Sequence, residues 1–257
     1  MSGRTAVISG AAQGIGHATV KRLMREGFSR FLLIDRQSEA LKARCAALAE
    51  AGAEATALVA DLAGMDWRAP LAAALARIGP VDVLVNAAGT TARGGIEDTT
   101  QETFDLIFHL NVRAPFFLMQ EVAQHMRAGG VIVNITSMLA YGGPPFLVPY
   151  SASKAALVAL TKGAANTLKQ RGLHVFAVNL GWTWTPGEQE VQTRVHGLAP
   201  DWAETIGARQ PFGRLLMPED PAGLIAFLVS PDARMMTGAV IDLDQYVAGT
   251  VEDNPGN

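Results

Sequence analysis

The sequence contains one cysteine, Cys45, among 257 residues. A single cysteine forms no disulfide within the chain and builds no cysteine-rich metal site. Cys45 lies in the helix-like run Ser38–Ala51, where we interpret it as an idle thiol. His109 and His196 have no companions at metal-ligand spacing, so we expect no metal site.

Long apolar runs and an excess of one charge are also missing. No apolar run reaches the roughly 18 residues of a membrane span. The sequence after Met1 shows no basic, apolar and cleavage regions in the order of a signal peptide. The net charge is -3 with mixed signs, so no basic surface for nucleic acid or an anionic membrane is predicted. We therefore expect a cytoplasmic protein whose partner is a small molecule.

Short β-rich apolar runs alternate with longer helical patterns, and 49% of the residues are hydrophobic. The strand runs hardly alternate with polar residues, which is typical of parallel strands buried on both faces. The pattern predicts a doubly wound α/β fold. The predicted strands are Thr5–Ser9, Phe31–Ile34, Ala55–Ala60, Val81–Asn86, Gly130–Thr136, His174–Asn179 and Ala239–Leu243. The predicted helices are Gly14–Glu26, Ser38–Ala51, Asp66–Ile78, Thr100–Arg127, Tyr150–Gln170 and Pro218–Ser230.

One segment, residues 181–217, breaks this rhythm. It contains three prolines and three tryptophans but no clean strand. A long irregular insertion in a compact domain is usually a lid or a binding loop. We predict one domain over residues 1–257, with residues 181–217 as a substrate-binding insertion.

The strand-to-helix turn Gly10–Gly16 carries three glycines in the spacing G-x-x-x-G-x-G. Glycines let the backbone turn tightly and approach a pyrophosphate at a helix N-terminus. The turn, with Gln13 and Ile15 between its glycines, therefore indicates a dinucleotide site, although a plain β–α turn has the same composition.

Acidic residues end the second and third predicted strands. Asp35 lies about 20 residues past the glycines, where a carboxylate binds the adenosine ribose and repels a 2′-phosphate. This predicts NAD, although Arg36 next to it would suit a 2′-phosphate if Asp35 were displaced. Asp61, followed by Leu62, suits the adenine amino group or caps the next helix.

The remaining candidates follow later strands. The small residues Asn86-Ala87-Ala88-Gly89 let a ring or ribose lie against the chain. Ser137 ends the fifth predicted strand, and Tyr150 and Lys154 are four residues apart on one predicted helix face. A nearby ammonium lowers the pKa of a phenol, which would let the tyrosine exchange a proton with an alcohol or carbonyl oxygen.

These motifs occur in order along nearly the whole chain, which resembles the short-chain dehydrogenase/reductase family. The motifs are the Gly10–Gly16 turn, Asn86–Gly89, Asn111, Ser137 with Tyr150 and Lys154, and Gly181 to Thr185. The resemblance implies a single Rossmann domain with seven parallel strands in the order 3-2-1-4-5-6-7 and helices on both faces. It also implies a homotetramer or homodimer.

The resemblance also implies roles for the matching residues. Tyr150 would be the catalytic acid/base, Lys154 would lower its pKa and bind the nicotinamide ribose, and Ser137 would orient the substrate oxygen. Asn111 would hold a water that links Lys154 to solvent. The Thr183 N–H and the Thr185 hydroxyl, after Gly181, would hold the carboxamide and pyrophosphate side of the cofactor.

Two positions depart from the family pattern. Leu180 replaces a proline, which we expect to loosen the turn. The last strand leads into Asp242-Leu-Asp244-Gln245-Tyr246 rather than a glycine pair. These residues either face an active site or form a solvated subunit edge.

The substrate is the least determined feature. Aromatic and apolar candidates suit a sugar or polyol or, equally, a hydrophobic ketone. Arg93 either binds a substrate carboxylate or is a solvated loop residue. The pocket candidates are Arg93, Met138, Leu139, Phe146, Trp182 and Trp184. We predict an NAD-dependent oxidoreductase of a secondary alcohol or ketone, with a sugar, polyol or sugar acid as the substrate. The alternatives are an NADPH-dependent reductase of apolar ketones and a non-catalytic NAD-binding redox sensor.

Overall fold

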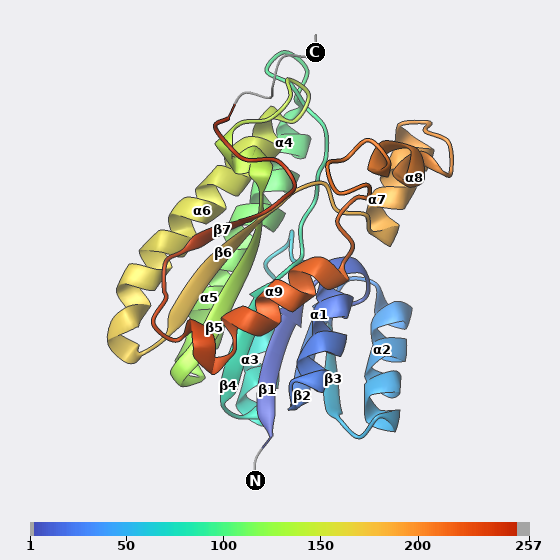
Figure 1. Ribbon diagram of the computed structural model, residues 1–257. Helices are drawn as coiled ribbons and strands as arrows, with labels where there is room; N and C mark the ends of the chain where they lie inside the picture. Colours follow the sequence, from blue (N-terminus) through green and yellow to red (C-terminus); the bar gives the residue numbers. More distant parts are fainter. Residues whose placement is uncertain (1–2, 251–257) are drawn as a thin grey trace.

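Seven parallel strands form one sheet in the order β3-β2-β1-β4-β5-β6-β7, in a computed structural model that describes residues 3–250 (Figure 1). This confirms the predicted order. Residues 1–2 and 251–257 of the predicted domain lie outside the described residues. The strands are β1 (Arg4–Ser9), β2 (Phe28–Asp35), β3 (Glu54–Val59), β4 (Val81–Asn86), β5 (Met126–Ser137), β6 (His174–Leu180) and β7 (Val240–Leu243).

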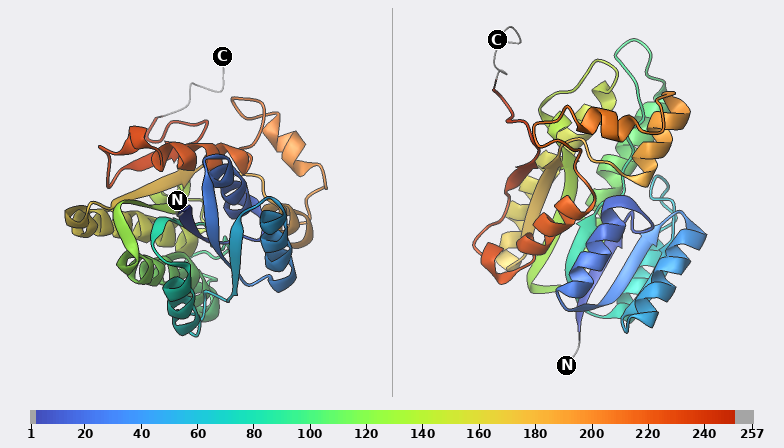
Figure 2. Two further views of the ribbon diagram at one scale, coloured as in Figure 1. Left: turned by 90° about the horizontal axis from the view of Figure 1, so that it is seen from below. Right: turned by 45° about the vertical axis from the view of Figure 1, so that its right-hand side comes forward.

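Helices cover both faces of the sheet, as Figure 2 shows from two further directions. Helices α1, α2 and α9 pack on one face, and α3, α5 and α6 pack on the other. The helices are α1 (Gly14–Arg25), α2 (Ser38–Glu50), α3 (Arg68–Ile78), α4 (Gln101–Phe108), α5 (Ala114–Gln124), α6 (Val148–Leu168), α7 (Pro186–Glu190), α8 (Trp202–Gly207) and α9 (Glu219–Leu228).

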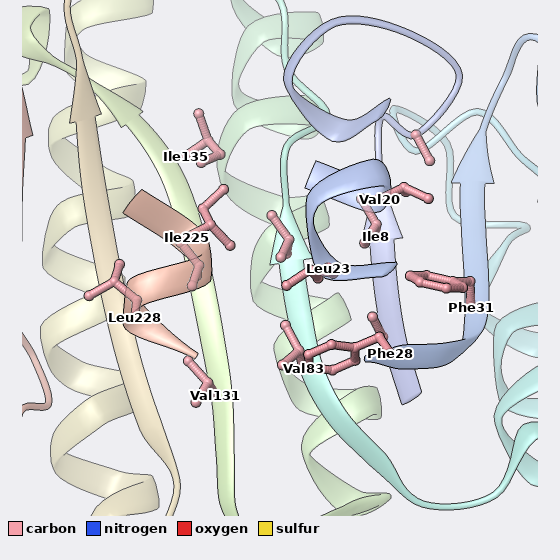
Figure 3. Packing of buried hydrophobic residues seen from close by; sticks show 14 of the residues in the cluster. Ile8, Val20, Leu23, Phe28, Phe31, Val83, Val131, Ile135, Ile225 and Leu228 are labelled. Carbon is pink, nitrogen blue, oxygen red and sulfur yellow. The ribbon is translucent and has the colours of Figure 1, made fainter. Parts of the chain in front are cut away.

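Each face of the sheet has its own apolar core because successive strand residues point to opposite faces. Ile8 of β1 packs with Leu23 of α1 and Ile225 of α9 in one core (Figure 3). Its neighbour Val7 lies in the other core, with Leu71 of α3. Burial on both faces explains why the strands are almost continuously apolar, and it leaves the carboxyl ends of the strands as the place for polar residues.

The predicted helix Thr100–Arg127 is wrong as a single element. It is interrupted by a π-helical turn at His109–Arg113, and β5 begins at Met126. Pro115 explains the interruption, because proline has no N–H to donate to the carbonyl of Asn111 four residues earlier. The Ala114 N–H instead bonds to the His109 carbonyl, five residues back.

The segment 181–217 contains no strand, as predicted, but it is not irregular throughout. Thr185 caps α7 by accepting a hydrogen bond from the Glu188 N–H at 3.0 Å. A π-helical turn, Val191–Val195, and the short helix α8 follow. These elements lie beyond the carboxyl ends of the strands, to the right of the sheet in Figure 1. No helix among residues 3–250 is long and apolar enough to cross a membrane.

Candidate active site

The glycine-rich turn connects β1 to α1 and has the geometry of a phosphate cradle. Gly10 and Gly14 adopt φ values of 69° and 54°, which favour glycine. A Cβ on Gly16 would overlap the carbonyl of Gly10, so the helix packs directly on the turn. No side chain caps the N-terminus of α1, so its first N–H groups remain available to an anion.

The segment after β6 lies against this turn from the other side. A Cβ on Gly14 would lie 3.3 Å from Cγ2 of Thr185, and one on Gly187 would lie 3.4 Å from Nε2 of Gln13. Two segments far apart in the sequence therefore bracket the space at the start of α1. Ile15 points away from it and packs on the core.

Asp35 at the end of β2 fixes the glycine-rich turn. Its carboxylate accepts hydrogen bonds from the Ala12 N–H and the Gln37 N–H, both at 3.0 Å. Arg36 beside it is exposed. The structure thus places a carboxylate, with the turn held against it, where an adenosine ribose is expected.

Asp61 does not cap α3, which begins at Arg68. Its carboxylate accepts a hydrogen bond from the Ala63 N–H at 3.0 Å and stabilises the turn after β3. The predicted helix-capping alternative is therefore wrong, because a turn separates the strand from the helix. Leu62 is buried in the core.

The Asn86 side chain points into the sheet rather than toward the strand ends. Its Nδ2 donates to Oδ1 of Asn134 at 2.7 Å, and Asn134 in turn donates to the Thr161 hydroxyl at 2.9 Å. The polar chain ties β4 to β5 and α6. Ala87, Ala88 and Gly89 follow, and a Cβ on Gly10 would contact the backbone of Ala87 and Ala88.

Asn111 lies in the π-helical turn and holds the loop after β4. Its Oδ1 accepts from the Thr90 N–H at 2.9 Å, and its Nδ2 donates to the Thr90 carbonyl at 3.0 Å and to the Ser153 hydroxyl at 3.1 Å. The amide is therefore fully engaged by protein groups. A water linked to Lys154 would use the Asn111 main-chain carbonyl, which Pro115 leaves without its usual helical partner.

Tyr150, Lys154 and Ser137 come together at the carboxyl end of β5. Tyr150 and Lys154 lie on one face of α6, with Nζ of Lys154 5.7 Å from the centre of the tyrosine ring. Nζ donates to the Ile135 carbonyl at 2.9 Å. Ser137 is close enough to Tyr150 to act on its phenol, and its hydroxyl accepts a hydrogen bond from the Leu139 N–H at 3.2 Å. The two predicted partners of Tyr150 are thus beside it.

Burial dominates the protonation of this pair. It raises the pKa of Tyr150 to about 12, an effect that the Ser137 hydrogen bond opposes and the negative charge of Glu188 increases. Burial also lowers the pKa of Lys154 to about 8. The direction for Tyr150 is opposite to the sequence-based prediction, because burial disfavours the charged phenolate.

Residues 182–184 form an extended stretch paired with Leu216. The Trp184 N–H donates to the Leu216 carbonyl at 2.8 Å, and the Leu216 N–H donates to the Trp182 carbonyl at 3.1 Å. Because N–H groups alternate along an extended chain, that of Thr183 points away from Leu216. This N–H is the one expected to meet the cofactor carboxamide.

Two tryptophans and a glutamate form a cluster next to this stretch. The ring of Trp182 stacks on that of Trp202 with centroids 5.5 Å apart. The Trp182 indole Nε1 donates to Oε1 of Glu188 at 2.9 Å. Trp184 instead donates to Gln189 at 3.2 Å. Of the two predicted pocket tryptophans, Trp182 is the one linked to the charge that acts on Tyr150.

The opposite side of the site is formed by the loop after β4 and the turn after β5. The Arg93 guanidinium lies over the ring of Phe146 at 4.6 Å, and both side chains are exposed. Burial lowers the pKa of His196, the positive charge of Arg93 lowers it further, and the negative charge of Glu188 opposes both effects. Met138 and Leu139 form a 3-10 turn directly after Ser137 and are half-buried.

The acidic end of β7 is tied to the strand ends. Asp242 accepts hydrogen bonds from the Tyr141 hydroxyl at 3.1 Å and from Nδ2 of Asn179 at 2.8 Å. Asn179 in turn accepts from Thr136 at 2.6 Å. A Cβ on Gly181 would overlap the Asp244 carboxylate. These residues therefore brace the loops around the site within this chain.

Sequence reasoning missed several residues that position the site. The Arg44 Nε donates to the Ala12 carbonyl at 3.1 Å, the Ser9 hydroxyl accepts from the Ala88 N–H at 3.3 Å, and Ser153 contacts Asn111. Arg44 and Ser9 act on residues distant in sequence, so no local pattern indicates them. In the part of the chain that the structure describes, no cluster of His, Cys, Asp or Glu side chains is arranged to hold a metal ion.

The fold and the site together define a class: doubly wound α/β oxidoreductases with a dinucleotide turn and a buried tyrosine–lysine pair. Residues 10–245 match the family described as enoyl-(acyl carrier protein) reductase. A sorbitol dehydrogenase of Cereibacter sphaeroides is 32% identical over 251 residues, covering 95% of this chain and 97% of the relative.

Solved structures agree with the sequence comparison. The short-chain dehydrogenase/reductase of Serratia marcescens BCRC 10948 has a TM-score of 0.83 and 33% identity, covering 94% of this chain and 96% of that one. The L-sorbose reductase of Gluconobacter frateurii, complexed with NADPH and L-sorbose, has a TM-score of 0.90 and 26% identity, covering 97% and 98%. The chain belongs to the short-chain dehydrogenase/reductase family of oxidoreductases.

Proposed function

We propose that this protein is an NAD(H)-dependent dehydrogenase that transfers a hydride between nicotinamide and a secondary alcohol or ketone, the substrate being a sugar, polyol or sugar acid. The observation that carries the proposal is the buried Tyr150, with Ser137 close to it and the Lys154 ammonium 5.7 Å from its ring centre. The similarity to a sorbitol dehydrogenase and an L-sorbose reductase supports the substrate class.

The residues of the turn fit a dinucleotide. A Cβ at Gly10 or Gly16 would meet main-chain atoms of Ala87 and Ala88 or of Gly10, so the turn packs by direct backbone contact, and the N-terminus of α1 has no side-chain cap. Thr185 and the Thr183 N–H would hold the nicotinamide half from the other side. The nicotinamide, when bound, supplies the hydride acceptor or donor, and the protein supplies position and charge.

The proton of the substrate hydroxyl has a route built from this chain. Tyr150 would accept it at its phenolic oxygen when it is present as the phenolate, with Ser137 holding the substrate oxygen. Lys154 loses its proton easily, because burial lowers the pKa of its ammonium to about 8. From Nζ the proton passes to a water at the Asn111 carbonyl and then to solvent. Reduction of a ketone runs the same route in reverse.

The preference for NAD rests on Asp35. Its carboxylate is held beside the glycine-rich turn by two backbone N–H groups at 3.0 Å, and a negative charge there repels a 2′-phosphate. The runner-up, an NADPH-dependent reductase, is favoured by the exposed Arg36 and by the NADPH bound to the L-sorbose reductase. A redox sensor without turnover ranks lower, since the chain keeps Tyr150, Lys154 and Ser137.

We also propose that the protein is a cytoplasmic homotetramer or homodimer and that residues 181–217 form its substrate-binding insertion. A hollow of about 430 Å³ between the loop at Gly95 and the start of α6 supports a subunit contact, since its walls are largely apolar. Phe104 on its rim is 44% exposed, as expected of a side chain that a second copy covers. Analytical ultracentrifugation of the full chain tests this, and a monomer at micromolar concentration would contradict it.

A dehydrogenase screen tests the function directly. Sugars, polyols, hydroxy acids and apolar alcohols are each supplied with NAD or NADP, and the reduced cofactor is followed by its absorbance. We expect turnover of polyhydroxylated alcohols with NAD, and loss of turnover in Tyr150→Phe. A response to apolar alcohols with NADP alone would favour the runner-up.

A further inference from the structure

Ala12 in the glycine-rich turn is held at both of its main-chain polar groups. Its N–H donates to the Asp35 carboxylate at 3.0 Å, and its carbonyl accepts a hydrogen bond from Nε of Arg44 at 3.1 Å. Asp35 ends β2 and Arg44 lies in α2, so the two side chains reach the turn from different elements. Ala12 is fully buried, and a buried carbonyl that loses its donor is costly to the fold.

These two side chains control the shape of the turn before α1. Within the described residues, no other side chain forms a hydrogen bond with the main chain of residues 10–14. The N–H groups of Gly10 and Ala11 donate to the Ile34 carbonyl at 2.9 and 3.3 Å, which fixes only the start of the turn. Two glycines of the turn have positive φ values, and glycine has many accessible conformations when nothing holds it. The peptide group that Arg44 holds would therefore lose its fixed orientation without that contact.

The guanidinium of Arg44 is the cation in contact with the turn. Arg44 is half-buried, and among the residues that the structure places it forms no ion pair. The neighbouring base, His17, is uncharged at neutral pH, because burial together with the charges of Arg44 and Lys21 lowers its pKa to about 4. A charged donor forms a stronger hydrogen bond with a carbonyl than a neutral donor does.

We propose that Arg44 is a positioning residue for the cofactor: it holds the Ala12 carbonyl and so keeps the glycine-rich turn in the shape that receives the adenosine and pyrophosphate half of NAD(H). This rests on the proposed dehydrogenase function and names a residue that sets its cofactor affinity. Asp35 serves both the Ala12 N–H and the expected ribose hydroxyls, whereas Arg44 serves the turn alone. A ligand that binds a turn already held in place loses less conformational entropy.

The test separates the hydrogen bond of Arg44 from its charge. Arg44→Met and Arg44→Gln have side chains of equal length, and in glutamine Nε2 is as many bonds from Cα as Nε of arginine. We expect the Kd for NADH to rise about 5- to 20-fold in Arg44→Met, and Arg44→Gln to bind at least about threefold more tightly than Arg44→Met. ADP-ribose, which lacks the nicotinamide ring, should weaken by the same factors, since the contact lies on the adenosine side.

Fluorescence titration with NADH and calorimetry with ADP-ribose measure these affinities on the full chain. The matched control is Lys42→Met, which removes a cation from the same helix. The Lys42 side chain is 62% exposed and pairs with Glu39 rather than with the turn, so the Kd for NADH should stay within about twofold of wild type.

Each other outcome decides against one of the proposals. An unchanged Kd in Arg44→Met, or equal Kd values in Arg44→Met and Arg44→Gln, overturns the positioning role and leaves the dehydrogenase intact. Wild-type protein that binds neither NADH nor NADPH overturns the proposed function instead. If Arg44→Met does not fold, Arg44→Gln alone should bind NADH about two- to fivefold more weakly than wild type, because its donor is neutral; an unchanged Kd there rejects the role of Arg44.

Discussion

The Lys154 ammonium lies 5.7 Å from the centre of the Tyr150 ring, and both side chains are buried on the same face of α6. Burial disfavours the charged form of each group, so it raises the pKa of the tyrosine to about 12 and lowers that of the lysine to about 8. At neutral pH and without cofactor, the tyrosine is therefore a neutral phenol, whereas the lysine is still an ammonium that loses its proton near pH 8. Because both groups are desolvated, a charged ligand bound beside them would shift their pKa values strongly.

Tyr150→Phe should abolish turnover while leaving the cofactor site intact. Removing a general acid/base costs about 10²- to 10⁴-fold in kcat. The glycine-rich turn and Asp35 are untouched, so the Kd for NADH should change by less than about twofold. Initial rates and NADH fluorescence titrations measure the two quantities. Tyr246→Phe, at a residue 42% exposed, is the control for loss of a phenol. Turnover within tenfold of wild type in Tyr150→Phe would remove the catalytic assignment.

The buried lysine should make stability depend on pH in a defined window. The pKa of Lys154 is lowered from 10.5 to about 8, so between these values the unfolded chain binds more protons than the folded one. Its contribution to the unfolding free energy is complete above pH 10.5 and is lost as the pH falls through 8. Between pH 8 and pH 10 the wild type should gain roughly 2 kcal/mol relative to Lys154→Met.

Urea unfolding of the cofactor-free protein at these two pH values measures this difference. Other titrating groups are common to both proteins and cancel in the comparison. Tyr150 acts with the opposite sign, because its pKa is raised and its contribution is lost as the pH rises from 10 toward 12. Equal pH dependence in the wild type and Lys154→Met would show that the lysine is not desolvated.

Asp35 should decide the choice of cofactor. We expect the wild type to bind NADH at least about tenfold more tightly than NADPH, because the carboxylate repels a 2′-phosphate. Asp35→Asn removes the charge and should reduce this preference about tenfold. Glu39→Gln, whose side chain is 88% exposed in the neighbouring helix, controls for net charge. Tighter binding of NADPH by the wild type would reverse the assignment.

Two glycines should respond oppositely to the same substitution. A methyl group at Gly16 would overlap the Gly10 carbonyl and lie 3.2 Å from Cα of Ala11, and these backbone atoms move only with the turn. We expect Gly16→Ala to destabilise the protein by about 1–3 kcal/mol and to weaken cofactor binding. Gly163 in α6 has no atom within 4 Å of an added Cβ, so Gly163→Ala should be neutral or stabilising by up to about 1 kcal/mol. Thermal unfolding of both variants measures the difference in stability. A stable Gly16→Ala protein with normal NADH affinity would show that the turn Gly10–Gly16 does not need a glycine at position 16.

Local patterns in the sequence were enough to predict a doubly wound α/β fold and the chain positions of the motifs, and the resemblance that these motifs carry implied the order of the strands. Uninterrupted apolar runs mark strands buried on both faces, and the glycine spacing marks the first turn. The prediction of one helix over residues 100–127 was wrong, because the apolar periodicity does not show where a backbone hydrogen bond is lost. Pro115 withholds a single hydrogen bond, and a π-helical turn results.

Local patterns could not predict contacts between residues that are far apart in the sequence. Arg44 reaches the Ala12 carbonyl, Asn111 clamps Thr90, and Asp242 joins Tyr141 to Asn179. Each contact depends on how the strand ends and loops meet in space, which no spacing of residue types records.

The sequence by itself determined the fold, the family and the identity of the tyrosine–lysine pair, since these follow from periodicity and short motifs. The tertiary structure alone decided the electrostatics of that pair. The sequence predicted a lowered pKa for Tyr150 from the nearby ammonium, whereas the folded protein raises it to about 12. The reason is physical: a charge pattern can be read along a chain, but desolvation depends on every atom that packs around the group.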